Sequence, residues 1–346
     1  MTAASGRADP RPEPTVGGRP PGPTVPAGKP LPGVAGAAFD APVTDGTAPH
    51  VAVVTGASRG IGRAIARRLA ADGIAVAAAG RSLRPGDGTL AGSLEETVDQ
   101  IHADGGRAVA IPFDLADRQA DRAQILSRAA DAFGAPVDIV VNNAAAERNF
   151  DQRFPDMTRD AFWRAVETNV WAAWELAAAA VPGMRQRGAG WILMISSSQA
   201  GPRLGPPFPP NPTYGAALYG GTKAMIDRIT TGAAMDLYDD GIAVNALAPE
   251  YQIATENAQR VAGVRADEAE PEETIAEAAL ALCTGDPAVL TGRIAYNLSL
   301  LVELNRPVHT VDGRALLPGW QPDDIDPSRL RTPYLRAAPH PVQSRR

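Results

Sequence analysis

Residues 51–62 read VAVVTGASRGIG, and this stretch decides the fold. The apolar run at 51–54 is typical of a buried strand, and a glycine-rich turn follows it. Residues 63–73 then carry apolar side chains at helical spacing and end at Gly73. A glycine-rich turn between a strand and a helix lets the backbone approach a pyrophosphate, which the positive helix N-terminus attracts. The stretch therefore predicts a dinucleotide site.

The same unit of strand and helix recurs along the chain. Further strands are expected at 74–79, 107–113, 137–142, 190–196, 242–248 and 293–298. Further helices are expected at 93–104, 117–133, 158–187, 214–240 and 271–282. This alternation predicts an α/β fold over residues 50–300: a single-domain, Rossmann-type, doubly wound parallel sheet flanked by helices.

Composition narrows the class of partner. The chain has 346 residues, 45% hydrophobic and 21% charged, and a formal net charge of -6, so it offers no basic surface for nucleic acid. A small-molecule substrate is expected instead. No run of about 20 apolar residues is present, so we expect no membrane span. The single cysteine, Cys283, cannot form an internal disulfide, which favours a reducing, cytoplasmic location.

The two ends of the chain differ from its middle. Residues 1–49 are rich in Pro and Gly and poor in large apolar side chains, which predicts a disordered leader. Residues 301–346 form a C-terminal extension with scattered Pro and Arg. Such an extension either wraps the fold or reaches a neighbouring subunit, and both possibilities stay open.

Tyr219 and Lys223 are the candidate catalytic pair. Residues four apart on a helix share one face. An ammonium beside a phenol lowers the phenol pKa from its ordinary value of about 10. Tyr219 is therefore predicted to act as a general acid or base near neutral pH.

The end of the second strand indicates which dinucleotide binds. An NAD-selective site would offer Asp or Glu there, whereas this chain has Gly80, Arg81 and Ser82. Arg81, with Arg59 in the glycine-rich turn, can pair with a 2′-phosphate. NADP(H) is therefore the predicted cofactor. The four histidines are scattered without ligand spacing, so no catalytic metal is predicted.

These motifs resemble the short-chain dehydrogenase/reductase family over residues 50–300. The residues that carry the resemblance are TGASRGIG (55–62), Asp114, NNAA (142–145), Asn169, ISSS (195–198), YGGTK (219–223) and VNALAP (244–249).

The resemblance implies a role for each matching residue. Tyr219 would be the general acid, Lys223 its activator and a ribose ligand, Ser197 the carbonyl-orienting hydroxyl, and Asn169 the holder of a relay water. Ser196 or Ser198 could replace Ser197 if the register differs by one. Asp114 would receive the adenine amino group, and Asn142 would either bind cofactor or stabilise the sheet centre. The implied cofactor-binding residues are Gly56, Ser58, Arg59, Gly60, Ile61, Gly62, Arg81, Asp114, Leu115, Asn143, Ala144, Tyr219, Lys223 and Pro249.

Three departures from the family pattern concern the substrate side. Residues 203–213 form a Pro-rich insertion, and Ala145 and Glu250 replace residues that are normally glycine. The Glu250 carboxylate either binds a polar substrate group or points outward. Substrate loops are expected near 200–213 and 250–272. Family members commonly pair through the helices at 158–187 and 214–240, so a homodimer or homotetramer is expected.

The sequence thus predicts an NADP(H)-dependent oxidoreductase that interconverts a ketone or aldehyde and an alcohol on a bulky, apolar substrate. Ser197, Tyr219 and Glu250 are the predicted substrate contacts. Two alternatives remain open. One is a dehydratase or epimerase with no net NADPH consumption, and the other is a non-catalytic, NADP-binding regulatory protein.

Overall fold

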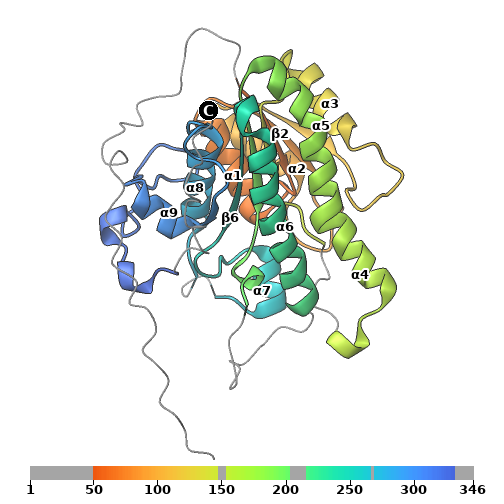
Figure 1. Ribbon diagram of the computed structural model, residues 1–346. Coiled ribbons are helices and arrows are strands. Elements are labelled where there is room, and N and C mark those ends of the chain that lie inside the picture. The colour runs from red at the N-terminus through yellow and green to blue at the C-terminus, as the bar shows by residue number, and fades with distance from the viewer. Residues whose placement is uncertain (1–49, 147–152, 203–215, 266–268, 332–346) are drawn as a thin grey trace, which may run out of the picture. The chain divides into compact units, whose positions relative to one another are not determined.

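A seven-stranded parallel sheet forms the centre of the computed structural model (Figure 1). The structure describes residues 50–146, 153–202, 216–265 and 269–331, all within one compact unit; the leader predicted at 1–49 lies outside them. The strand order is β3-β2-β1-β4-β5-β6-β7. The strands are Val51–Thr55 (β1), Ala75–Gly80 (β2), Ala108–Pro112 (β3), Ile139–Asn142 (β4), Gly190–Ile195 (β5), Ile242–Ala248 (β6) and Ile294–Tyr296 (β7).

The strands are nearly continuous apolar runs because both faces of the sheet are covered. Every residue of β1, β4, β5 and β6 is buried. Strand β1 lies between β2 and β4, so the strand order reverses there, and such a point opens a crevice at the carboxyl ends of the strands. The predicted doubly wound fold is confirmed.

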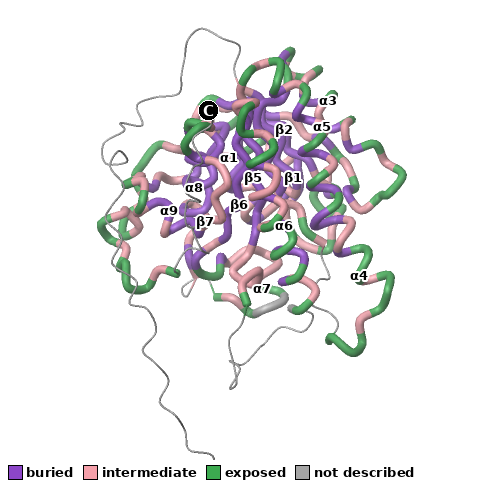
Figure 2. The backbone as a smooth tube through the Cα atoms, viewed as in Figure 1, coloured by how far each residue is buried: buried purple, intermediate pink, exposed green. Residues whose placement is uncertain are grey.

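Helices pack on both faces of the sheet (Figure 2). One face is covered by α1 (Gly60–Ala71), α2 (Leu94–Ala103), α8 (Glu272–Thr284) and α9 (Asn297–Glu303). The other face is covered by α3 (Ala123–Phe133), α5 (Ala172–Arg187) and α6 (Ala216–Leu237).

The helix predicted at 158–187 is interrupted. A π-helical turn at Glu167–Trp171 joins α4 (Arg159–Val166) to α5. Such turns hold an extra residue and often occur at functional sites. The buried Arg122 side chain fixes this one, because it donates to Glu167 Oε1 at 2.8 Å and to Glu175 Oε2 at 2.5 Å.

Three other predicted boundaries are corrected. The strand expected at 293–298 ends at Tyr296, because Asn297 begins α9. The helix expected at 117–133 begins at Ala123, whose N–H is held by the Asp121 side chain in a turn. The loop expected at 250–272 contains a short helix, α7 (Glu256–Ala262), which the Thr255 side chain caps.

The described part of the C-terminal extension packs on the same domain. Val308 is completely buried, and Arg306 and His309 both contact Glu277 of α8. The described residues of the extension, 301–331, therefore lie against the fold of their own chain, and contact with a neighbouring subunit stays a prediction.

Candidate active site

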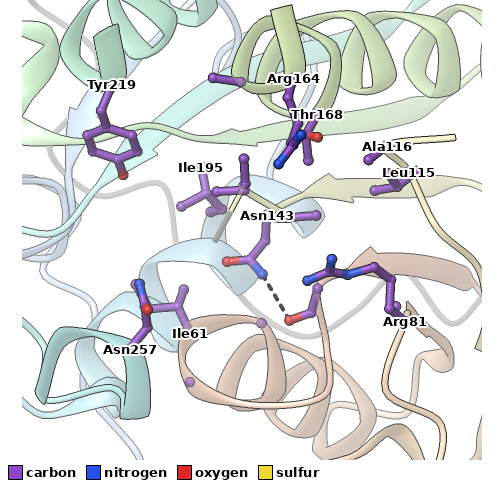
Figure 3. Close-up of a pocket in the computed structure, with 18 of the residues that line it drawn as sticks. Ile61, Arg81, Leu115, Ala116, Asn143, Arg164, Thr168, Ile195, Tyr219 and Asn257 are labelled. Carbon is purple, nitrogen blue, oxygen red and sulfur yellow. Dashed lines mark hydrogen bonds between the residues drawn. The ribbon is translucent and has the colours of Figure 1, made fainter. Parts of the chain in front are cut away.

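A cavity of about 750 Å³ opens where the sheet order reverses (Figure 3). Residues directly after four strands line it: Gly56 after β1, Asn143 after β4, Ser196 after β5 and Pro249 after β6. All predicted cofactor-binding residues contribute to its lining: Gly56, Ser58, Arg59, Gly60, Ile61, Gly62, Arg81, Asp114, Leu115, Asn143, Ala144, Tyr219, Lys223 and Pro249.

The glycine-rich loop requires its glycines. Gly56 and Gly60 have positive φ angles of 66° and 52°, which side chains disfavour. A Cβ on Gly62 would lie 2.4 Å from the Gly56 carbonyl oxygen. The Asn143 amide points at this loop and donates to the carbonyls of Thr55 (2.9 Å) and Gly56 (3.2 Å). These glycines leave the backbone at the N-terminus of α1 open, so a pyrophosphate can approach it closely.

Helix α6 and the end of β5 bring the predicted catalytic residues together. The Tyr219 hydroxyl is hydrogen-bonded to Ser197. Lys223 Nζ donates to the Ile195 carbonyl at 2.6 Å and lies 5.7 Å from the Tyr219 ring centroid. Ser197, Tyr219 and Lys223 all line the cavity. Of the three consecutive serines, Ser197 is thus the one that the structure pairs with Tyr219.

The pKa values of Tyr219 and Lys223 both differ from their ordinary values. Burial raises this pKa above its ordinary value, and the hydrogen bond with Ser197 offsets only part of the effect. Burial also lowers the pKa of Lys223 to about 8, against the opposing charge of Asp227. The lowering of the phenol pKa by the Lys223 ammonium stays a prediction.

Asn169 is a connecting residue in this structure. It lies in the π-helical turn and is 2% exposed. Its Oδ1 accepts from the Ala146 N–H at 2.8 Å, and its Nδ2 donates to Thr222 Oγ1 at 3.1 Å. Asn169 thereby joins the segment after β4 to Thr222 of α6, the residue that precedes Lys223. Its role with a relay water stays a prediction.

The two arginines predicted to bind a 2′-phosphate are placed differently. Arg81 is exposed at the cavity edge. Arg59 instead holds the loop after β2: its Nε donates to the Ala91 carbonyl at 2.7 Å, and its Nη2 donates to the Gly92 carbonyl at 2.8 Å and to Ser82 Oγ at 3.2 Å. Arg59 therefore organises the loop that borders Arg81.

The ends of β3 and β4 complete the opposite wall. Asp114 Oδ1 accepts from the Ala116 N–H at 3.0 Å, which shapes the turn that follows β3. Asn142 is buried, does not line the cavity, and donates to the Ala173 carbonyl at 3.3 Å. Of the two roles open for Asn142, the geometry favours the stabilisation of the sheet centre.

Glu250 fits neither of its predicted orientations. Its side chain is 0% exposed, so it does not point outward. It is also absent from the cavity lining, whereas the preceding Pro249 is present. The carboxylate is instead held by Ser299 and by the backbone N–H of Arg331, and its burial raises its pKa. The sequence could not show this contact, because the partners are far away in the chain.

Other lining residues were not predicted, and two of them have polar side chains that adjoin Asn169. Arg164 of α4 and Thr168 of the π-helical turn lie together on one side of the cavity (Figure 3). Their spacing of four, just before Asn169, is the signal that could have indicated them. In the described part of the chain, no group of His, Cys, Asp or Glu side chains is arranged to hold a metal. Among the described helices, none has the length and apolar character to cross a membrane.

Comparison with known proteins identifies the family. A model of the short chain dehydrogenase family matches residues 50–264. The chain is 32% identical to the ketoacyl reductase HetN of Nostoc sp. over 199 residues, which are 58% of this chain and 62% of that protein. It is 33% identical to the gluconate 5-dehydrogenase of Gluconobacter oxydans over 210 residues, which are 61% of this chain and 73% of that protein.

A solved structure with the same fold carries a bound dinucleotide. It is a metagenomic short-chain oxidoreductase in complex with NADP, 27% identical, with a TM-score of 0.56 over 71% of this chain and 96% of that one. The chain thus belongs to the short-chain dehydrogenase family, whose enzymes are NAD(P)-dependent oxidoreductases.

Proposed function

We propose that this protein is an NADP(H)-dependent reductase of a ketone or aldehyde, with Tyr219 as the proton donor. One observation carries the proposal: Tyr219, Ser197 and Lys223 meet on the wall of the same cavity that the glycine-rich loop enters. The Tyr219 phenol has an ordinary pKa of about 10, which burial raises, so its hydroxyl has a proton to deliver to a carbonyl oxygen.

Each residue of this group has a separate role in the proposed reduction. NADPH, when bound, supplies the hydride that the carbonyl carbon receives. Tyr219 delivers the proton to the carbonyl oxygen, and the Ser197 hydroxyl donates a hydrogen bond to the same oxygen as it gains negative charge. The Ile195 carbonyl fixes Lys223 Nζ near the Tyr219 ring, where its charge favours the phenolate left after proton transfer.

Several observations support NADP(H) over NAD(H). No carboxylate closes β2; Gly80, Arg81 and Ser82 line the cavity there. An exposed guanidinium can bind a phosphate in a bidentate manner. The oxidoreductase of similar fold described above also holds NADP.

A bulky, mostly apolar carbonyl compound is the proposed substrate. Ile195, Leu218 and Met157 contribute apolar side chains to the cavity. The names of the two relatives describe one ketoacyl and one sugar-acid substrate. The insertion predicted to wall the substrate site, 203–213, lies outside the described residues.

We also propose that the protein self-associates through α6 and through the segment that joins α4, the π-helical turn and α5. Four large aromatic side chains along the segment from α4 to α5 are each between 42% and 52% exposed: Phe162, Trp163, Trp171 and Trp174. An apolar group of this kind commonly marks a protein interface. Analytical ultracentrifugation would test this proposal, and a purely monomeric protein would refute it.

The decisive experiment measures NADPH oxidation against a panel of apolar ketones. Tyr219→Phe is expected to lower kcat by at least about 100-fold, because the proton donor is lost. Tyr238→Phe, at a 50% exposed tyrosine outside the cavity, is the matched control. Full activity of Tyr219→Phe would refute the assigned acid. Product formation without net NADPH loss would favour a dehydratase or epimerase.

Cofactor choice is tested separately by binding. Arg81→Ala is expected to weaken NADPH binding more than NADH binding, because the 2′-phosphate loses a cation. Arg84→Ala, at an exposed arginine on the same loop that pairs with Glu95, is the control. Equal losses for both dinucleotides would remove the 2′-phosphate role from Arg81.

A further inference from the structure

Glu250 lies between the cavity and the C-terminal extension. It directly follows Pro249, which lines the cavity, while its own side chain is fully buried outside the lining. The Glu250 N–H donates to Asn297 Oδ1 at 2.7 Å, and its Oε2 accepts from Ser299 Oγ at 2.9 Å. Both partners belong to the first turn of α9, so Glu250 is held by the helix that leads into the extension.

The end of the described extension returns to the same point. The Arg331 N–H donates to Glu250 Oε1 at 2.6 Å, and Arg331 Nε donates to the Glu250 carbonyl at 3.0 Å. The Tyr251 hydroxyl donates to the Arg329 carbonyl at 2.8 Å. The Arg331 guanidinium also lies over the Tyr296 ring, 5.6 Å from its centroid. Residues 329–331 are thus joined by backbone and side chains to the cavity wall, by which we mean residues 249–252, of which Pro249 lines the cavity.

A second buried carboxylate fixes this wall from another element. Glu270 is 2% exposed and accepts from the Tyr251 N–H at 3.0 Å, as well as from Thr274 and Asn297. The Glu270 N–H in turn donates to the Gln252 carbonyl at 2.9 Å. Residues 250–252 are therefore held by the segment before α8 and by the C-terminal extension together.

Burial makes these contacts depend on one another. A buried carboxylate that loses a hydrogen-bond donor keeps the full cost of its desolvation. If residues 329–331 moved away, Glu250 would lose the Arg331 N–H and its nearest cation, whose Nε lies 3.7 Å from Oε1. The wall and the extension are therefore expected to stay in place or loosen together.

The position of this wall matters because β5 and β6 end side by side. The Ser196 N–H donates to the Leu247 carbonyl at 2.8 Å, so Pro249, two residues beyond Leu247, lies on the side of the cavity that carries Ser197. A shift of about 1 Å at a reacting site can lower a rate by about 100-fold.

We propose that Glu250 and Arg331 fasten the C-terminal extension to the cavity wall and thereby position Pro249 at the carbonyl-binding end of the site. Glu250 is in this sense a positioning residue. The catalytic consequence rests on the proposed function, whereas the fastening itself does not.

The test compares Glu250→Ala, the isosteric Glu250→Gln and Arg331→Ala, with Arg314→Ala as the control arginine of the same extension. Arg314 contacts the end of α2 and not the cavity wall. Amide hydrogen exchange of residues 250–252 and 328–331 is expected to accelerate together by about tenfold or more in Glu250→Ala. The carbonyl KM is expected to rise about tenfold while the NADPH Kd stays within about twofold.

The variants separate the possible outcomes. Glu250→Gln keeps one oxygen that can accept from the Arg331 N–H, and its amide N–H can donate to the Ser299 hydroxyl, so it should restore most of the protection. Arg331→Ala should repeat the Glu250→Ala pattern more weakly. Faster exchange in one segment alone, or a carbonyl KM that does not change in Glu250→Ala, would overturn the proposal. If the wild type reduced no carbonyl, coupled exchange would still establish the fastening, and the proposed function alone would fail.

Discussion

Glu250 and Glu277 are both fully buried, and both hold the C-terminal extension, but different groups compensate their charges. Glu277 accepts from Arg68 Nε at 2.7 Å and from Arg306 Nε at 2.8 Å, and His309 lies 3.3 Å away. The carboxylate of Glu250 accepts from a hydroxyl and a backbone N–H, and its nearest cation is 3.7 Å away. The first glutamate is surrounded by cations and the second by dipoles.

The pKa values of the two carboxyl groups are shifted in opposite directions as a result. Burial alone would raise the pKa of Glu277, but the hydrogen bond and charge of Arg68, with the charge of Arg306, leave it below its ordinary value. Burial raises the pKa of Glu250, and its weaker partners do not reverse that. Burial therefore does not fix the direction of a pKa shift; the charge of the neighbours does.

The largest expected effect comes from removal of the cation-paired carboxylate. Glu277→Ala leaves Arg68, which is 5% exposed, without its main partner, and should reduce the free energy of unfolding by about 3–5 kcal/mol. Chemical denaturation measures the loss. Glu273→Ala, one turn earlier on α8, is the control and should cost no more than about 1 kcal/mol. Similar losses at both positions would mean that the Arg68–Glu277 contact is unimportant.

The opposite pKa shifts predict opposite pH dependences. The stabilisation from Glu277 is complete above its unfolded pKa of about 4.3 and is lost as the pH falls through its lower folded pKa. Glu250 binds its proton more tightly when folded, so its contribution declines as the pH rises above about 4.3. As the pH rises, the free energy of unfolding of Glu277→Gln should fall relative to that of the wild type. That of Glu250→Gln should rise relative to the wild type. Denaturation curves from acid to neutral pH that change in the same direction would contradict this contrast.

Lys223 and Asp227 provide a third buried case, in which the charge of each group opposes the effect of burial on the pKa of the other. Burial lowers the pKa of Lys223 to about 8, and the charge of Asp227 raises it. Burial likewise raises the pKa of Asp227 to about 6. Asp227→Asn should therefore move the alkaline limb of the kcat profile to lower pH, because Lys223 deprotonates earlier. Asp236→Asn, at an exposed residue of α6, is the control, and an unchanged limb in Asp227→Asn would exclude this coupling.

The smallest effect is expected at the edge of the Glu277 cluster. His309 is 29% exposed at its side chain, so His309→Gln should cost less than about 1 kcal/mol of the free energy of unfolding. The same denaturation series measures it. A loss as large as that of Glu277→Ala would assign the histidine a main role in the cluster.

The sequence was sufficient where the signal is local. The strand and turn at 51–62 predicted the cavity position, and the spacing of Tyr219 and Lys223 predicted one shared helix face. Long-range packing was not visible in the sequence. The environment of Glu250 depends on Arg331, the role of Arg59 depends on the loop at 90–92, and the raised pKa of Tyr219 depends on burial. The helical pattern at 158–187 also concealed the π-helical turn.

That π-helical turn lets the two parts of one long helix, α4 and α5, present different sides to the rest of the protein. Each residue advances an α-helix by about 100°, so one additional residue rotates everything that follows by that angle. Arg164 and Thr168 can face the cavity while Leu176 and Ala180 are buried against the sheet. Deletion of a single residue between Glu167 and Trp171 would force these two faces into one register, so this helix tolerates substitution more readily than any change in its length.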